Sequence, residues 1–184
     1  MTRTASTMLA LGTTAPEFSL PDVISGQIMT RDHVAGSRGL LVMFLCVHCP
    51  FVQHVNAELA RLGHDYAGRG IGIVAIGSND AEAYPDDAPE GLRAQAMQHG
   101  FTFPYLYDES QDVARAYHAV CTPDYFLFDA GKKLVYRGQL DASRPGNGIA
   151  VDGRDLRAAM DSVLAGTPVA EEQQASIGCS IKWK

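Results

Sequence analysis

Two short runs of apolar residues mark the first half of the chain as the centre of a buried sheet. Residues 40–45 (LLVMFL) and 71–76 (IGIVAI) contain no polar side chain. Such runs are typical of strands that are covered on both faces. Between them, apolar residues recur three and four positions apart, which predicts a helix with one apolar face. These residues are Val52, Val55, Leu59, Leu62 and Tyr66.

The rest of the chain continues this alternation of strands and helices. Residues 16–29 combine short apolar alternation with turn residues, which predicts a small N-terminal hairpin. Residues 125–128 and 133–136 flank a turn and predict a closing hairpin. The other expected elements are a helix at 87–100, a strand at 103–107, a helix at 112–118 and a helix at 152–164. This order predicts one α/β domain over residues 1–184, with a mixed central sheet, helices on both faces and an N-terminal β-hairpin extension.

The ends of the domain carry weaker signals. Residues 1–14 are expected to be a loosely held lead-in, and residues 166–184 a C-terminal tail. The tail is expected to pack on the domain from Ser176 onward, with Trp183, the only tryptophan, partly buried. The string Asp87-Ala88-Pro89-Glu90 resembles a capping box, so the Asp87 side chain is expected to cap the following helix.

Composition and charge narrow the class of protein. The chain has 184 residues, of which 46% are hydrophobic and 20% charged, as in an ordinary globular domain. Its formal net charge is -6 and no basic cluster is present, which argues against nucleic acid or an anionic membrane as partner. The longest apolar run, residues 40–46, is far shorter than the ~20 residues that span a bilayer. We therefore expect a soluble, cytoplasmic protein.

A pair of cysteines carries the strongest chemical signal. Cys46 and Cys49 lie where the first buried strand gives way to the long helix. If Cys46 caps the helix, the free amides of the first turn and the helix dipole point at its sulfur and favour the thiolate. His48, when protonated, adds positive charge beside it. The pattern therefore predicts a redox-active dithiol that needs no cofactor.

The same pair could be half of a zinc site. A structural zinc site needs two further ligands, and the sequence contains no second C-x-x-C and no histidine pair at ligand spacing. This favours redox chemistry, with no metal expected.

Pro123 is the fourth expected catalytic residue, beside Cys46, His48 and Cys49, and the expected auxiliary groups are Thr122, Cys121 and Cys179. Pro123 stands at the head of a predicted strand, where an X-Pro bond can be cis and can form a docking wall for an extended substrate. Cys121 is either a third redox thiol or a small core residue. Cys179 is either a resolving thiol carried by the tail or part of a packed tail.

These motifs resemble those of the thioredoxin superfamily. The segment from Ala15 to Asp22 (APEFSLPD) resembles the branch that holds the alkyl hydroperoxide reductase and thiol-specific antioxidant proteins. The strand, the C-x-x-C, the helix and Thr122-Pro123 complete the resemblance, which covers about residues 10–184. It implies a thioredoxin-like fold, a redox-active dithiol and a cis peptide bond before Pro123.

Two departures bear on the activity. Peroxiredoxins carry a proline and a threonine or serine seven and three residues before the cysteine that attacks peroxide. Cys49 aligns with that cysteine, but the earlier positions are Val42 and Cys46. The arginine that peroxiredoxins place near the site is also missing. The departures favour disulfide exchange over peroxidase activity.

We therefore expect a thiol–disulfide oxidoreductase that uses its Cys-Val-His-Cys motif. Cys46 is expected to be the lower-pKa nucleophile and Cys49 the resolving thiol, with His48 stabilising the thiolate and Thr122-Pro123 positioning the substrate. Its partners would be a protein or small-molecule disulfide and an electron-donor thiol. The alternatives are a thiol peroxidase in which Cys49 attacks peroxide, and a non-catalytic metal-binding or redox-sensing module.

Overall fold

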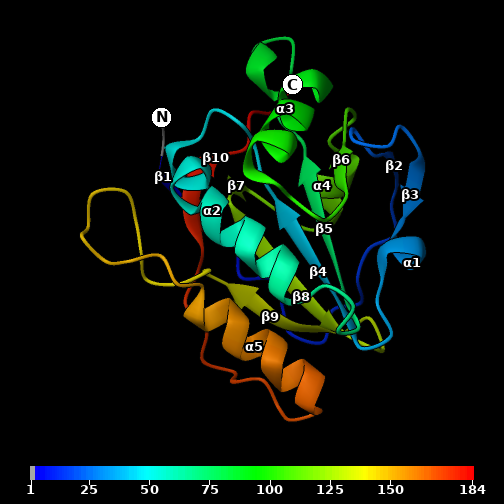
Figure 1. The fold of residues 1–184 in the computed structure, drawn as a ribbon, viewed down its shortest axis with the longest axis vertical. Coiled ribbons are helices and arrows are strands. Elements are labelled where there is room, and N and C mark those ends of the chain that lie inside the picture. Colours follow the sequence, from blue (N-terminus) through cyan, green and yellow to red (C-terminus); the bar gives the residue numbers. More distant parts are fainter. Residues whose placement is uncertain (1–2) are drawn as a thin grey trace.

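A five-stranded mixed sheet forms the centre of the molecule (Figure 1). The computed structural model describes residues 3–184. In spatial order the strands are β6 (Tyr105–Tyr107), β5 (Ile71–Gly77), β4 (Gly39–Phe44), β8 (Asp124–Asp129) and β9 (Leu134–Gly138). β4 pairs with β5, and β5 with β6, in parallel, whereas the pairs that involve β8 are antiparallel. The expected mixed sheet with an antiparallel closing hairpin is confirmed.

Strand β4 is buried on both faces because its side chains alternate between two apolar cores. Leu41 and Met43 belong to one core, and Leu40 and Val42 to the other. The helices are α1 (Arg31–Val34), α2 (Pro50–Asp65), α3 (Pro89–His99), α4 (Asp112–Ala116) and α5 (Arg154–Ala165). The first core is closed by α2, α3 and α5, and the second by α4, so helices cover both faces as expected. Figure 1 shows α2 and α5 beside one another on one face of the sheet.

The N-terminal hairpin is also confirmed. It consists of β2 (Ser19–Pro21) and β3 (Ile28–Thr30), which pair antiparallel. Asp22, buried in the turn, accepts hydrogen bonds from the backbone amides of Ser25 at 3.0 Å and Tyr105 at 3.0 Å. One carboxylate therefore ties the hairpin to the edge strand β6. Within residues 3–184, no helix is both long and apolar enough to cross a bilayer.

Both ends of the chain meet in a second sheet, beside the N-terminus of α2. It has the order β1 (Arg3–Ala5), β10 (Ile177–Ser180) and β7 (Cys121–Thr122), and both pairs are antiparallel. Further along the lead-in, the amide of Gly12 donates to the Leu134 carbonyl at 2.8 Å. The prediction of a loosely held lead-in is therefore wrong for the described residues 3–14, because backbone pairing fastens them.

The C-terminal tail packs on the domain as predicted. The Ser176 hydroxyl donates to the Pro123 carbonyl at 2.6 Å, and the amide of Ile181 donates to the Val120 carbonyl at 2.9 Å. Trp183 keeps 38% of its surface exposed and lies under the Arg115 guanidinium, 4.5 Å from the ring centre. The tail is thus fixed by backbone and serine contacts, with its tryptophan at the surface.

Candidate active site

The predicted dithiol lies at the junction of β4 and α2, beneath the short strand β7. Cys46 and Cys49 are both buried, with 1% and 0% of their surface exposed. Thr122 touches both sulfurs: its hydroxyl lies 3.1 Å from Cys46 Sγ, and its carbonyl oxygen lies 3.2 Å from Cys49 Sγ. The Thr122-Pro123 peptide bond is cis, as predicted. The structure therefore brings the C-x-x-C pair and the Thr122-Pro123 segment together.

The start of α2 differs from the expected register. The helix begins at Pro50, so Cys49 and not Cys46 is its N-cap residue. Proline is favoured at the first helical position, where its missing amide hydrogen has no partner to lose. The free amides and the positive end of the helix dipole therefore lie next to Cys49.

Cys49, and not Cys46 as predicted, is the thiol with the lower pKa. A hydrogen bond from Cys46 lowers the pKa of Cys49 to about 5, and the Cys179 thiol and the backbone amides of Val52 and Cys179 act in the same direction. Burial acts in the opposite direction, but the donors outweigh it. The hydrogen bond to Cys49, burial and the nearby Asp87 carboxylate raise the pKa of Cys46 well above its ordinary value. Both directions oppose the expectation that Cys46 is the lower-pKa thiol, and the N-cap position of Cys49 removes the helix-capping argument for it.

His48 lies beside the dithiol and is held by an acidic residue. Its Nδ1 is 2.5 Å from Asp87 Oδ2, and its ring stacks on Tyr84 with 5.0 Å between centres. Asp87 also accepts hydrogen bonds from the backbone amide of Val47 at 2.7 Å and from the Asn79 side chain at 2.8 Å. Asp87 therefore fixes both the cysteine loop and the His48 ring.

Asp87 belongs to this candidate site, although the sequence pattern predicted that it would cap helix α3. Helix α3 begins at Pro89 with Ala88 as N-cap and without a side-chain cap, so the expected capping by Asp87 is wrong. The acidic side chain turns away from its own helix and accepts hydrogen bonds from partly buried donors 39 and 40 residues earlier in the chain. A local sequence motif cannot reveal hydrogen bonds to donors so far away in the chain.

The site contains one group of side chains that could hold a metal ion. Ligand atoms of Cys46, His48 and Asp87 lie within 4.8 Å of one another among the described residues. Both oxygens of Asp87 already accept hydrogen bonds from Val47, His48 and Asn79. A metal would have to displace some of these donors, so the geometry favours a hydrogen-bonded thiol site over the metal-binding alternative.

A third cysteine joins the dithiol. Cys179 lies on β10 directly opposite Thr122, and its Sγ is 2.7 Å from Cys49 Sγ. Burial, with the neighbouring Cys49 sulfur, raises the pKa of Cys179 to about 12. Cys121 is placed differently: its sulfur lies 3.8 Å from the Pro123 carbonyl, and burial raises its pKa. Thr122 contacts both sulfurs, whereas Cys121 on the same strand is buried beside Asp124, and Cys49 and Cys179 also contribute to its raised pKa.

A buried carboxyl group follows the cis peptide bond. Asp124 begins β8 and has no exposed surface. Burial raises its pKa to about 7, although nearby polar groups oppose the rise.

This carboxyl group should make stability depend on pH. In the unfolded chain an aspartate has a pKa near ~3.9, so between about pH 4 and 7 the folded state holds an extra proton. The free energy of unfolding should therefore fall as pH rises through this window, by up to about 4 kcal/mol. The Asp124→Asn variant should lack this dependence in urea titrations at pH 4.5 and 7.5. The exposed Asp86→Asn variant should retain it, and an equal slope in all three proteins would contradict the assignment.

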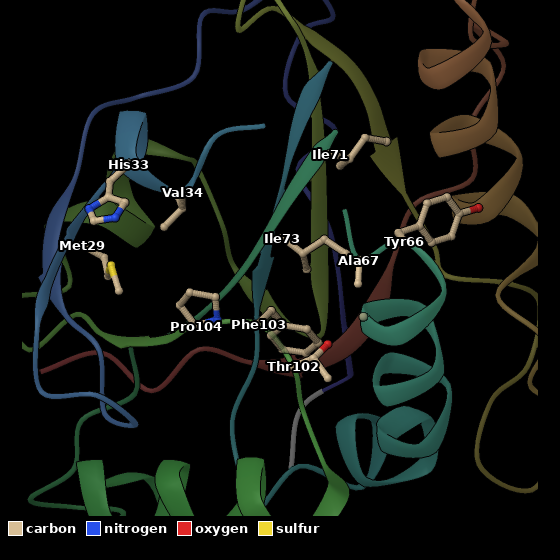
Figure 2. Close-up of a pocket in the computed structure, with 11 residues that line it drawn as sticks. Met29, His33, Val34, Tyr66, Ala67, Ile71, Ile73, Thr102, Phe103 and Pro104 are labelled. Carbon is tan, nitrogen blue, oxygen red and sulfur yellow. The ribbon is translucent and has the colours of Figure 1, made fainter. Parts of the chain in front are cut away.

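A pocket of about 300 Å³ lies elsewhere, between α1, β5 and the C-terminal end of α2 (Figure 2). Its lining includes Met29, His33, Tyr66, Ile73 and Phe103, and no cysteine. Most of these groups are apolar, and the pocket is separate from the cysteine site.

The fold and site together define a thioredoxin-like protein. The thioredoxin domain of a thiol-disulfide oxidoreductase from Bacteroides vulgatus superposes with a TM-score of 0.59 at 20% identity, covering 70% of this chain and 88% of that one, which shows the shared fold. The AhpC/TSA family model matches residues 11–137, so the chain belongs to the AhpC/TSA family.

Two closer relatives refine this picture. The thiol:disulfide interchange protein DsbE of Allochromatium vinosum is 32% identical over 134 residues, which cover 70% of this chain and 67% of that protein. The crystal structure of an uncharacterized conserved protein from Geobacillus kaustophilus superposes with a TM-score of 0.98 at 54% identity, covering 100% and 97% of the two chains. The family and its relatives confirm the expected enzyme class, an oxidoreductase that acts on sulfur groups.

Proposed function

We propose that this protein is a thiol–disulfide oxidoreductase whose catalytic dithiol is Cys46 and Cys49. The observation that carries the proposal is that one residue, Thr122, contacts both sulfurs at the tip of α2. The name of the Allochromatium relative, a thiol:disulfide interchange protein, supports the same chemistry.

The reaction would transfer two electrons in two exchange steps. The Cys49 thiolate attacks one sulfur of a substrate disulfide, and the other substrate sulfur leaves as a thiolate that takes up a proton. Cys46, deprotonated as it attacks, then displaces the substrate from Cys49. The enzyme is left with a Cys46–Cys49 disulfide, and an electron-donor thiol restores the reduced pair.

The roles within the pair follow from the environment of each sulfur. Cys49 has the lowered pKa and is the better-populated thiolate, whereas Cys46 is protonated until the second step. His48 and Asp87 hold the loop that carries both cysteines, so they position the pair. Neither cysteine has more than 1% of its surface exposed, so a small disulfide, or a protein disulfide admitted by local movement, would be the substrate. We retain the cytoplasm as the proposed location, on the charge and apolar pattern of the sequence alone.

The proposal predicts a reversible disulfide between Cys46 and Cys49. After mild oxidation and alkylation at low pH, mass spectrometry should find a peptide of residues 39–61 that has lost two hydrogen atoms. The protein before alkylation should reduce insulin with dithiothreitol as donor, and Cys121→Ala should match the wild type because the proposed reaction uses only Cys46 and Cys49. Full alkylation of both cysteines after oxidation, without loss of activity, would rule out a catalytic dithiol.

A second candidate function, thiol peroxidase, is supported by the lowered pKa of Cys49, because thiolates are the form that peroxide oxidises. Peroxide consumption measured on the same preparation separates the two. A sulfenic acid at Cys49 and faster turnover of peroxide than of disulfide would favour the peroxidase. Stoichiometric metal that purifies with the protein, with neither activity, would favour a metal-binding module.

A further inference from the structure

The C-terminal strand brings a third sulfur to the dithiol with a fixed register. Cys179 pairs with Thr122 on one side of β10 and with Arg3 on the other. Its sulfur is 2.7 Å from Cys49 Sγ and only 2% of the residue is exposed. The contact joins residues 130 positions apart in the chain. Backbone pairing on both sides of β10 therefore fixes the position of Cys179 beside Cys49.

A glycine beside Cys179 permits this close approach. A Cβ atom at Gly178 would lie 1.9 Å from the Thr122 carbonyl oxygen and 3.0 Å from the Pro123 nitrogen. Any other residue at position 178 would therefore push β10 away from the cis peptide and withdraw Cys179 from Cys49. Because the obstacle is backbone and not a flexible side chain, the strand itself would have to move.

We propose that Cys179 is a third redox thiol that exchanges with Cys49. The inference rests on the proposed function and extends it: Cys49 is a central sulfur that bonds either to Cys46 or to Cys179. Cys46 Sγ and Cys49 Sγ both contact Thr122, and Cys179 Sγ contacts Cys49 Sγ, so both partners lie beside the same sulfur.

The exchange is balanced without any added oxidant. Starting from the Cys46–Cys49 disulfide, the Cys179 thiol loses its proton and its thiolate attacks Cys49 Sγ. The Cys49–Cys179 bond forms as the Cys46–Cys49 bond breaks, and Cys46 leaves as a thiolate that takes up a proton. Oxidation of Cys49 also removes its negative charge, which is one cause of the raised pKa of Cys179, so the attacking thiolate becomes easier to form.

The result is a second oxidised form with distinct properties. Cys46 becomes a free thiol at the same site, and the Cys49–Cys179 bond links β10 to the N-terminus of α2. The same step can release a substrate held on Cys49, so Cys179 serves as an alternative resolving thiol.

The test maps disulfide bonds in variants in which one cysteine is replaced by serine. Trypsin separates residues 39–61, which hold Cys46 and Cys49, from residues 158–182, which hold Cys179. Oxidised Cys46→Ser should join these two peptides as its major product, at least tenfold above Cys49→Ser. Gly178→Ala in the Cys46→Ser background should lower the yield several-fold, and thermal unfolding should verify that each variant is folded.

The outcomes separate this inference from the proposed function. If the wild type forms the Cys46–Cys49 bond and reduces insulin, but Cys46→Ser never joins the two peptides, only the role of Cys179 is refuted. If the joined peptides form equally in folded Cys49→Ser, Cys179 pairs with Cys46 and the central role of Cys49 is wrong. Failure of the wild type to form the Cys46–Cys49 bond would refute the proposed function itself.

Discussion

Replacing Cys49 with serine is expected to abolish disulfide exchange. Cys49 is the sulfur with the lowered pKa and contacts both other site thiols, so its loss removes the attacking thiolate and the central partner. Removal of a nucleophile from a catalytic group costs on the order of 10³-fold or more in rate. Insulin reduction and cleavage of a small chromogenic disulfide measure the loss, and Cys121→Ala is the matched control.

A trapping experiment identifies the attacking sulfur. Cys46→Ser alone should not accumulate a mixed disulfide, because Cys179 can displace the substrate. The double variant Cys46→Ser/Cys179→Ser should hold the substrate on Cys49. A mixed disulfide trapped instead on Cys46 in Cys49→Ser would reverse the assignment and restore the order expected from the sequence.

Replacing Asp87 with alanine is expected to produce the largest loss of stability among the site residues. Its buried carboxylate accepts from Val47, His48 and Asn79, and the substitution leaves these donors without their partner. Breaking such a buried charged network costs about 3–5 kcal/mol in the free energy of unfolding.

Urea denaturation measures this loss, and the adjacent Asp86→Ala is the control because Asp86 is exposed. Asp86→Ala should change the free energy by less than about 0.5 kcal/mol, as is usual for surface positions. Equal effects of the two substitutions would show that Asp87 does not hold the cysteine loop. Exchange activity of folded Asp87→Asn should also fall, because its amide cannot accept all three hydrogen bonds.

The sheet was predictable because its strands carry unbroken apolar runs. Leu40 to Leu45 can be buried only between two layers, and the structure fills both with helices. The dithiol was also predictable, since a C-x-x-C between strand and helix needs only local spacing. The N-cap was misplaced although Pro50 carried the signal: proline is favoured at the first helical position, which points to Cys49.

The missed features all depend on partners distant in sequence. Arg3–Ala5 shows no strand pattern of its own and becomes a strand because β10 offers it backbone partners. Asp87 matches a local capping motif, but donors about 40 residues earlier use its carboxylate. The approach of Cys179 to Cys49 depends on the pairing of β10 with Thr122 and on the absence of a side chain at Gly178.

The distance in sequence between Cys49 and Cys179 also has a consequence during protein synthesis. The two sulfurs are separated by 130 residues. At ~5–20 residues per second, the ribosome adds Cys179 roughly 6–26 s after Cys49. Until then Cys49 can form a bond with Cys46 but not with Cys179 of the same chain. Translation therefore lets the Cys46–Cys49 bond form before any bond to Cys179 is possible.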